Sequence, residues 1–536
     1  MLIPLLVVLV MLPQISFGAD YYLSAAGRDT NSGGSRQSPW RSLNKINDVI
    51  LDPGDRVFLR GGDSFAGNLF FDAFDQGTAA APIRIGSYGT GRATILAGDG
   101  DGIFAYNTAG FVISNLNVRG SGADVNDGAG IIFYTDLPGG VKLDSVTLSR
   151  IDASGFHHAG VEVGAWNGTT GFTNVSINGV RAYDNAKNGI TVWGYDAPGF
   201  RGYAHRNVFV TGSFAYRNQG ISGVREPTGN GIVLSNVDGG RIARSVAHSN
   251  GARNTSSSGP IGIWAWRANR ITIQFNESYG NRTTAGASDG GGFDLDGGMT
   301  NSVLQYNYSH DNDGAGYLLA QYESAPSFRN NVVRYNISQN DGRRNTYGGI
   351  MVWSKSPLEI SNSHIYNNTI YLSPSTTGNV CGIRVPSRTS SLTIRNNIIF
   401  TTAGAPLLCV ASGQQGLAVQ GNTYWSNGAP FKIQWGSTLY SSLSSFRGTG
   451  QEMLQGVPTG LNLNPGLVRP GLGGTINNPN GLAKMLEYRL TTNSPLINRG
   501  LDLGSRFGLA TGTRDFYGTT LPQRGAFDIG AHELAY

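Results

Sequence analysis

The segment Ile271-Thr-Ile-Gln-Phe-Asn-Glu-Ser-Tyr279 decides the fold, because related segments recur along much of the chain. Apolar side chains alternate with polar ones from Ile271 to Phe275, which predicts a short β-strand with one buried face. Asn276 interrupts the alternation and marks a polar turn. A second alternating stretch, Gly292-Phe-Asp-Leu-Asp296, follows that turn and predicts another strand.

The asparagine of this segment returns at a nearly constant spacing. It occupies positions 276, 307, 336, 368, 397 and 422, and the corresponding upstream places hold Asn115, Arg150, Gly179, Gly212 and Arg244. Eleven copies of about 30 residues, with no room for a helix, cannot each bury an apolar face and must stack. Leucine-rich repeats would show a recurrent leucine frame, and propeller blades need about 40 residues or more. The sequence therefore predicts an all-β fold, a single-stranded right-handed parallel β-helix of about eleven coils with N- and C-terminal caps.

Composition agrees with many short strands joined by tight turns. The 536 residues include 78 glycines, and only 14% of the residues are charged. This composition argues against a helical bundle. The net charge of +5 permits an anionic polymer as partner. The sequence contains no run of Lys or Arg that would indicate binding to nucleic acid or to a membrane surface. We also expect the protein to be a monomer.

The order of segments predicts one domain with a cap at each end. We expect a signal peptide over residues 1–19, because residues 3–12 are apolar, too short to span a bilayer, and followed by small residues. An uncleaved anchor is the alternative, since no Lys or Arg precedes the apolar segment. Residues 20–100 are predicted as an N-terminal cap, 101–435 as the β-helix and 436–536 as a C-terminal cap closing the far end. The mature protein is expected outside the cell or in the periplasm.

Cys381 and Cys409 are the only cysteines, so no cysteine-based metal site is available. Their separation of 28 residues is close to one coil. They would therefore either stack and form a local disulfide in an oxidising compartment, or remain two small buried residues.

Three features resemble secreted right-handed β-helix proteins of the pectate-lyase-like superfamily. They are the asparagine ladder, the opening Tyr21-Tyr-Leu-Ser-Ala-Ala-Gly-Arg-Asp-Thr-Asn-Ser-Gly33 and the closing Arg524-Gly-Ala-Phe-Asp-Ile-Gly-Ala-His532. The resemblance covers nearly the whole mature chain and implies the fold. It leaves the reaction open, because the superfamily includes polysaccharide lyases, glycoside hydrolases, epimerases and non-catalytic adhesins.

The strand that opens with Gly in each copy places its second and fourth residues on the outside of the coil, because its first and third residues are apolar throughout. We call these outward positions the outer stripe. They are Glu162, Thr191, Trp193, Val233, Ser235, Trp264, Trp266, Asp294, Asp296, Leu318, Ala320, Met351, Trp353 and Arg384.

Four of the eight tryptophans lie on the outer stripe, which predicts a sugar-binding face. Parallel strands stack about 4.8 Å apart, so Trp193 and Trp266, two coils apart, would lie roughly 10 Å apart. Aromatic faces bury the apolar surface of sugars. The alternative is that long turns cover these rings. The residues predicted to bind substrate are Trp193, Trp264, Trp266, Trp353, Glu162, Arg384, Lys187 and Arg225.

Asp294 and Asp296 lie midway along the outer stripe and are predicted to be a catalytic pair. Residues two apart on one strand are about 6.6 Å apart at Cβ, near the ~6.5–9.5 Å separation of inverting glycosidases. Neighbouring carboxylates raise each other's proton affinity, which yields one acid and one base. The alternative is that both, with Asp289, bind Ca²⁺ or cap turns.

The next copy adds His310-Asp-Asn-Asp-Gly-Ala-Gly316, whose turn is expected beside the aspartate pair. Asp313 is predicted to assist catalysis there, with His310 as another candidate, because polar turn residues at a groove edge often do so. The alternative for both is ordinary turn chemistry.

A rival chemistry is β-elimination on a uronate, which needs a base for the C5 proton and cations near the carboxylate. Its candidates are Lys187, Arg225, Arg343, Arg344 and Arg384, with His157 and His158 as alternative bases. These residues are dispersed over several coils, whereas the acids are concentrated in one.

Three hypotheses for the function follow. The first is a secreted glycoside hydrolase acting on a polysaccharide that lies along the β-helix. The second is a polysaccharide lyase or epimerase using the same groove. The third is a glycan-binding surface protein without catalysis. The first requires no cofactor, and Ca²⁺ bound by Asp289, Asp294 and Asp296 is the alternative use of the aspartates.

Overall fold

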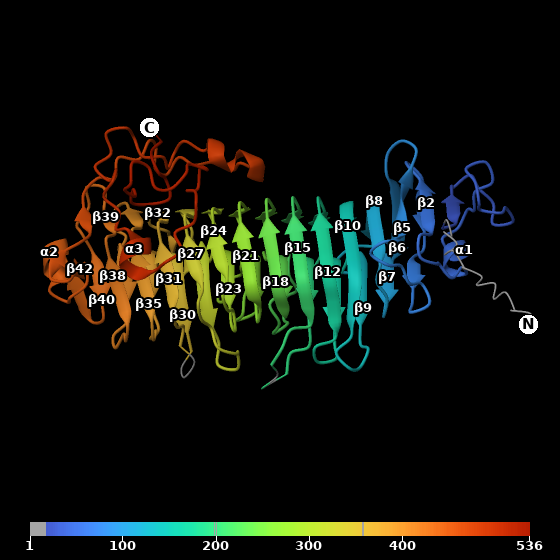
Figure 1. The fold of residues 1–536 in the computed structure, drawn as a ribbon, viewed down its shortest axis with the longest axis horizontal. Helices are drawn as coiled ribbons and strands as arrows, with labels where there is room; N and C mark the ends of the chain where they lie inside the picture. The colour runs from blue at the N-terminus through green and yellow to red at the C-terminus, as the bar shows by residue number, and fades with distance from the viewer. Residues whose placement is uncertain (1–17, 198, 200, 356–358, 536) are drawn as a thin grey trace, which may run out of the picture.

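The computed structural model describes residues 18–197, 199, 201–355 and 359–535. Its core is a β-solenoid of about 11 turns with almost no helix, which confirms the predicted fold class (Figure 1). Most of the predicted signal peptide, residues 1–17, lies outside the described residues. No helix in the described ranges is long and apolar enough to cross a membrane.

The first of two long sheets carries the outer stripe, and we call it the groove sheet. Its neighbouring strands are parallel, except for the last pair, which is antiparallel. In order, its 14 strands are β4 (Leu69–Phe71), β7 (Ile103–Tyr106), β9 (Ile131–Thr135), β11 (Ala159–Ala165), β14 (Asn188–Trp193), β17 (Asn230–Ser235), β20 (Ile261–Trp266), β23 (Gly291–Asp296), β26 (Tyr317–Gln321), β30 (Gly348–Ser354), β34 (Cys381–Val385), β37 (Leu408–Val410), β40 (Ile433–Trp435) and β41 (Thr438–Tyr440).

The second long sheet, which we call the ladder sheet, has 26 strands and supplies the other walls of the solenoid. Its strands are β1 (Asp20–Leu23), β2 (Arg56–Arg60), β3 (Ser64–Ala66), β5 (Ile83–Tyr88), β6 (Ala93–Gly98), β8 (Phe111–Gly120), β10 (Lys142–Ser154), β12 (Gly171–Asn178), β13 (Arg181–Tyr183), β15 (His205–Thr211), β16 (Phe214–Tyr216), β18 (Val237–Ala243), β19 (Val246–His248), β21 (Asn269–Gln274), β22 (Glu277–Tyr279), β24 (Val303–Gln305), β25 (Tyr308–His310), β27 (Val332–Arg334), β28 (Ile337–Gln339), β31 (Ser363–Tyr366), β32 (Thr369–Leu372), β35 (Leu392–Arg395), β36 (Ile398–Thr401), β38 (Leu417–Gln420), β39 (Thr423–Trp425) and β44 (Leu461–Asn462).

The remaining elements are short. Two small sheets pair β29 (Arg344–Asn345) with β33 (Thr377–Gly378), and β42 (Met453–Leu454) with β43 (Val457–Pro458). The helices are α1 (Asn44–Asn47), α2 (Leu443–Arg447), α3 (Leu503–Phe507) and the 3₁₀ helix η1 (Pro479–Lys484).

A central coil contains three strands, one more than the sequence predicted. In the coil that begins at β21, the repeat marker itself forms the extra strand β22, and β23 follows in the groove sheet. The chain bends between β21 and β22, where Phe275 adopts a left-handed conformation with φ of 56°. Such a conformation is costly for a bulky residue and persists only where its surroundings hold it. Strand β22 was not predicted because the bend before it contains no Gly or Pro, the residues that usually mark a turn.

The repeated asparagines form a buried ladder at this bend. Asn307 donates its side-chain amide to the side-chain oxygen of Asn336 at 3.1 Å and to the carbonyl of Ile273 at 2.9 Å. Its own side-chain oxygen accepts from the backbone and side-chain amides of Asn276, both at 3.0 Å. The same arrangement continues through Asn368, Asn397 and Asn422. Each rung thus satisfies polar groups that the bend removes from water.

Regular strand pairing begins near the N-terminal end of the described residues. Strand β1 pairs with β2 and β2 with β5, so the parallel ladder begins at Asp20, inside the segment expected to be a separate cap. At the other end, Leu443 and Phe446 of α2 join the main core.

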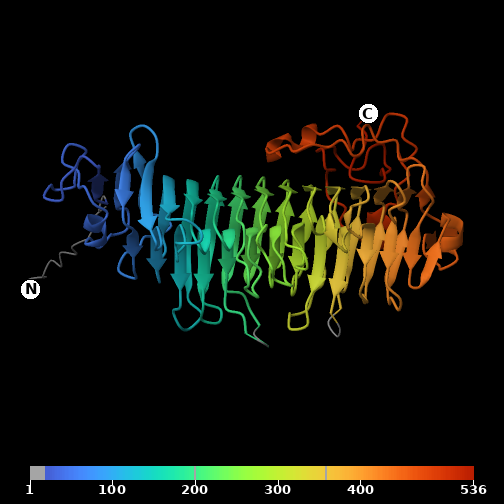
Figure 2. The same ribbon diagram turned by 180° about the vertical axis from the view of Figure 1, so that it is seen from behind.

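The C-terminal segment lies along one side of the solenoid instead of closing its end (Figures 1 and 2). Its Leu467, Leu490, Tyr488 and Phe516 pack with Tyr308 and other aromatic residues of the ladder sheet into a second core cluster. The sequence showed an irregular tail, but it contained no signal for this long-range packing.

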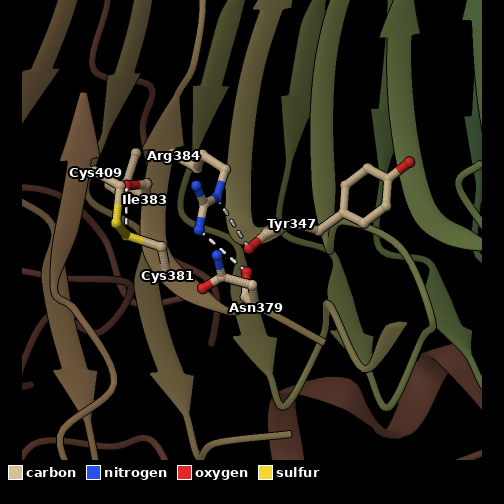
Figure 3. The surroundings of a disulfide bond; sticks show 6 residues. All are labelled: Tyr347, Asn379, Cys381, Ile383, Arg384 and Cys409. Carbon is tan, nitrogen blue, oxygen red and sulfur yellow. Dashed lines mark hydrogen bonds between the residues drawn. A yellow bond between two sulfur atoms is a disulfide. The ribbon is translucent and has the colours of Figure 1, made fainter. Parts of the chain in front are cut away.

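Cys381 and Cys409 form a disulfide between β34 and β37, so of the two alternatives left open by the sequence the paired one is correct (Figure 3). Their Cα atoms are 6.3 Å apart, and the bond joins two consecutive coils. Arg384 lies beside it and donates to the carbonyl oxygens of Tyr347 and Asn379, at 3.4 and 3.1 Å.

Removal of this disulfide is expected to loosen the last coils. The bond closes a loop of 28 residues, and loops of this size contribute about 3 kcal/mol to the free energy of unfolding. The double variant Cys381→Ser, Cys409→Ser should therefore unfold its C-terminal coils at lower urea concentration than the oxidised protein. Tryptophan fluorescence in urea, with and without reductant, measures this. An unchanged transition after reduction would contradict the expectation.

Candidate active site

The outer stripe exists as predicted, and its residues are aligned from strand to strand. In one row, Glu162 pairs with Thr191, Val233 with Trp264, Trp264 with Asp294, and Asp294 with Leu318. In the parallel row, Trp266 pairs with Asp296 and Ala320 with Trp353. The aspartates therefore have a tryptophan next to them on the preceding strand, about 4.8 Å away.

A groove of about 990 Å³ runs over these two rows. Its lining includes Trp193, Trp264, Trp266, Trp353, Glu162 and Lys187, together with Asp289, Asp294 and Asp296. Its walls come from loops and contain Asp196, Glu226, Tyr322 and Tyr347. The volume is in the range of sites that enclose most of a small organic ligand.

Apolar clusters flank the aspartates on both sides. Val233, Ile261 and Trp264 pack together with Trp266 before the aspartates, and Leu318, Ala320, Tyr347 and Met351 pack with Trp353 after them. The rings of Trp264 and Trp266 are stacked, with centroids 6.4 Å apart. Trp264 is only 6% exposed, whereas Trp193, Trp266 and Trp353 are half-buried. The alternative interpretation, that long turns cover the tryptophan rings, thus applies mainly to Trp264.

Asp294 and Asp296 differ in their surroundings although both project from β23. Asp294 is 3% exposed, and its Oδ1 has no hydrogen-bond partner among the described residues. Burial, and then the charges of Asp296 and Asp289, raise the pKa of Asp294 well above its ordinary value. Asp296 is half-buried and accepts a hydrogen bond from the backbone amide of Gly297 at 2.6 Å. Burial raises the pKa of Asp296 to about 7, with a further contribution from the charge of Asp289.

Asp289 is the third carboxylate of the groove, and we call Asp289, Asp294 and Asp296 the aspartate cluster. Asp289 is half-buried and lies before β23 in a left-handed conformation with φ of 58°. Its Oδ1 accepts from the hydroxyl of Tyr347 at 2.8 Å, and its Oδ2 accepts from the backbone amide of Gly259 at 3.0 Å. Burial raises the pKa of Asp289, and these two hydrogen bonds act in the opposite direction. They also fix the orientation of the carboxylate.

A second polar group lies toward the N-terminal end of the groove. The indole of Trp193 donates to Glu162 Oε1 at 2.7 Å, and His158 Nδ1 lies 3.9 Å from Glu162 Oε2. Lys187 Nζ lies 3.4 Å from Glu226 Oε2, and both residues line the groove. Burial raises the pKa of Glu162.

Several predicted site residues lie outside the groove. Asp313 is 5% exposed, accepts from the backbone amide of Thr283 and pairs with Arg282 and Arg344, so its carboxylate is occupied. His310 is buried in the ladder sheet between Glu277 and Asp311. The groove lining also lacks Arg225, Arg343, Arg384 and His157. The guanidinium of Arg343 donates to the carbonyl oxygens of Asp341, Ser373 and Pro374.

From the sequence, Asp289 was predicted only as a possible Ca²⁺ ligand. Four residues that line the groove were not predicted as site residues: Tyr347, Tyr322, Asp196 and Glu226. These four belong to loops whose lengths vary from coil to coil, so the repeat does not predict which of them reach the groove. Within the described ranges, no group of three or more His, Cys, Asp or Glu side chains is arranged to hold a metal ion. Binding of Ca²⁺ by Asp289, Asp294 and Asp296 stays a prediction.

Comparison with known proteins gives similarity in both sequence and structure. A family model described as a right-handed β-helix region matches residues 334–446. The chain is 28% identical to lacto-N-biosidase from Bifidobacterium longum subsp. longum, in a match covering 67% of this chain and 27% of that protein. It thus spans about a quarter of the length of this relative.

Among solved structures, GH136 lacto-N-biosidase from Eubacterium ramulus superimposes with a TM-score of 0.53 at 19% identity, covering 76% of this chain and 67% of that one. Pectate lyase Pel9A matches with a TM-score of 0.40 at 15% identity, covering 97% of each chain. The parallel ladders, the family match and the superposition on lacto-N-biosidase together identify this chain as a right-handed β-helix protein.

Proposed function

We propose that this protein is a glycoside hydrolase that cleaves a glycan lying in the groove. The observation that carries the proposal is the aspartate cluster, three carboxylates gathered midway along a groove with tryptophans on both sides. The distant similarity to lacto-N-biosidase, a glycoside hydrolase, supports hydrolysis over elimination. The disulfide is compatible with an oxidising compartment and supports the predicted secretion.

The surroundings of the three carboxylates support different roles. Asp296, half-buried and with a pKa of about 7, suits the general acid that protonates the leaving oxygen. Asp289 is oriented by Tyr347 and Gly259, whose hydrogen bonds oppose the rise in its pKa caused by burial, and this suits a carboxylate acting as base or nucleophile. Asp294 was predicted to share these roles with Asp296. Its burial favours a protonated group that supports the cluster, so Asp289 replaces it in the proposed pair.

Elimination on a uronate has less support. It needs cations around the substrate carboxylate, whereas the described lining contains six carboxylates and a single lysine, Lys187. That lysine already contacts Glu226. A glycan-binding protein without catalysis would explain the tryptophans but not three carboxylates with raised pKa values.

The test is an activity screen of the purified protein on neutral and uronate-containing glycans, recording new reducing ends and the ultraviolet absorbance of unsaturated products. Reducing ends without absorbance support hydrolysis. Ultraviolet absorbance of unsaturated products would indicate elimination instead. Glycan binding without either signal would indicate a binding protein. Repeating the screen with a chelator tests calcium, because a calcium-dependent reaction stops and the proposed one continues.

Turnover is expected to fall as the pH rises above about 7. The general acid is active only when protonated, and the raised pKa of Asp296 keeps it protonated up to about pH 7. The dependence of kcat on pH should therefore show an alkaline limb with a midpoint near that value. Any residual activity of Asp296→Asn should lack this limb. An alkaline limb of equal midpoint in the variant would assign the titration to another group.

A further inference from the structure

A second cavity adjoins the groove and is lined by arginines. It has a volume of about 210 Å³, equal to the share of about seven molecules in liquid water. Arg201, Arg267 and Arg329 line it from three different coils, with the hydroxyl residues Thr300 and Ser327. We call this cavity the arginine pocket.

The arginine pocket carries an excess of positive charge. Arg267, 7% exposed, forms an ion pair with Asp196. The side chains of Arg201 and Arg329 are exposed and have no hydrogen-bond or ion-pair partner within the part of the chain that the structure describes. Three guanidinium groups therefore line the pocket, and Asp196 pairs with one of them. Guanidinium groups bind carboxylate and sulfate-like oxyanions through paired, charge-assisted hydrogen bonds.

Gly298 lines the arginine pocket at a point where a larger residue would not fit. Its φ is 78°, and a Cβ added there would lie 2.9 Å from Pro326 Cδ and 3.4 Å from Arg267 Cα. A larger residue would be strained and would displace this wall. The hydroxyl of Thr300, another lining residue, donates a hydrogen bond to Asn269 Oδ1 at 2.9 Å.

One wall separates the arginine pocket from the groove. Arg267 follows Trp266, which lines the groove, and its partner Asp196 lines the groove as well. The groove itself offers an anion little attraction, because Lys187 is the one lysine among its described lining residues and already contacts Glu226. An anionic group on a bound glycan would therefore gain more from the arginine pocket than from the groove.

We propose that the arginine pocket binds the anionic group, a sulfate ester or a carboxylate, of a carbohydrate. That the anion is carried by a carbohydrate rests on the proposed function, whereas the anion preference rests on the three arginines. The pocket then determines specificity: the sugars in the groove are uncharged, and a neighbouring substituent carries the charge.

Ligand-observed NMR titration at low salt tests this with galactose, galactose 6-sulfate, glucuronate and sodium sulfate as probes. Galactose 6-sulfate and glucuronate are expected to bind more tightly than galactose. The variant Arg329→Gln should weaken both about tenfold and leave galactose unchanged, because one charge-assisted pair is lost. Arg201→Gln should act in the same direction.

Arg84→Gln is the matched control, since Arg84 is an exposed arginine on β5, far from the pocket along the chain. It should change none of the affinities. Equal affinities in wild type and Arg329→Gln would overturn the proposal, as would binding of sodium sulfate without binding of either anionic sugar. These outcomes are independent of catalysis: a protein that binds the anionic sugars but releases no reducing ends contradicts the hydrolase proposal alone.

Discussion

Replacement of Asp296 by Asn is expected to lower kcat about 10²–10⁴-fold, because the side chain can no longer transfer a proton to the leaving group. The amide has nearly the same shape as the carboxylic acid, and its oxygen can still accept from the backbone amide of Gly297. Folding and glycan binding should therefore persist. Single-turnover rates, together with circular dichroism and a binding titration, measure the three properties separately.

Matched variants at the neighbouring aspartates decide which carboxylate works with Asp296. Asp289→Asn should reduce kcat as strongly as Asp296→Asn, since it removes the proposed base or nucleophile. Asp294→Asn should have a smaller effect, because the buried group is already protonated. Asp313→Asn is the control outside the groove. Near-normal turnover of Asp296→Asn would contradict the assignment of Asp296 as the general acid. A larger loss of kcat in Asp294→Asn than in Asp289→Asn would favour the pair predicted from sequence, Asp294 and Asp296.

The fold and the outer stripe could be predicted because both depend on a local period. Alternation within a strand determines which side chains face outward, and the repeat determines which strands are neighbours, so Trp266 beside Asp296 follows from sequence alone. The coil length also predicts that Cys381 and Cys409 stack, but only the structure shows that they form a disulfide.

The walls of the site could not be predicted because they depend on loops. The hydrogen bond of Tyr347 to Asp289 joins residues 58 positions apart, about two coils, and both belong to turns whose conformation does not follow the alternation of the strands. The partners of Asp313 could not be predicted for the same reason, since its turn directs the carboxylate toward Arg282 and Arg344. The C-terminal segment packs on the ladder sheet through scattered apolar residues such as Leu467 and Phe516, a contact that only the folded chain reveals.

The asparagine ladder is the feature whose loss should cost most stability. In Asn307→Ala, the backbone and side-chain amides of Asn276 lose their acceptor. The carbonyl of Ile273 and the side-chain oxygen of Asn336 lose a donor. Each buried group left without a partner costs about 1–3 kcal/mol, so we expect the free energy of unfolding to fall by about 3 kcal/mol or more. Asn301→Ala, at an exposed asparagine of the same coil, should cost less, mainly the strain of about 1 kcal/mol that alanine suffers at its φ of 52°.

The loss should be local as well as large, because each coil contacts mainly its neighbours and stability is nearly a sum over coils. Tyr306, next to Asn307, has a φ of 58°, and the ladder holds this strained bend in place. Hydrogen exchange of Asn307→Ala should therefore accelerate in the coils around residues 273–339 before the N-terminal coils respond. Uniform protection, or a thermal transition matching that of Asn301→Ala, would mean that apolar stacking alone holds the bends. In that case the asparagine would recur once per coil without stabilising the solenoid.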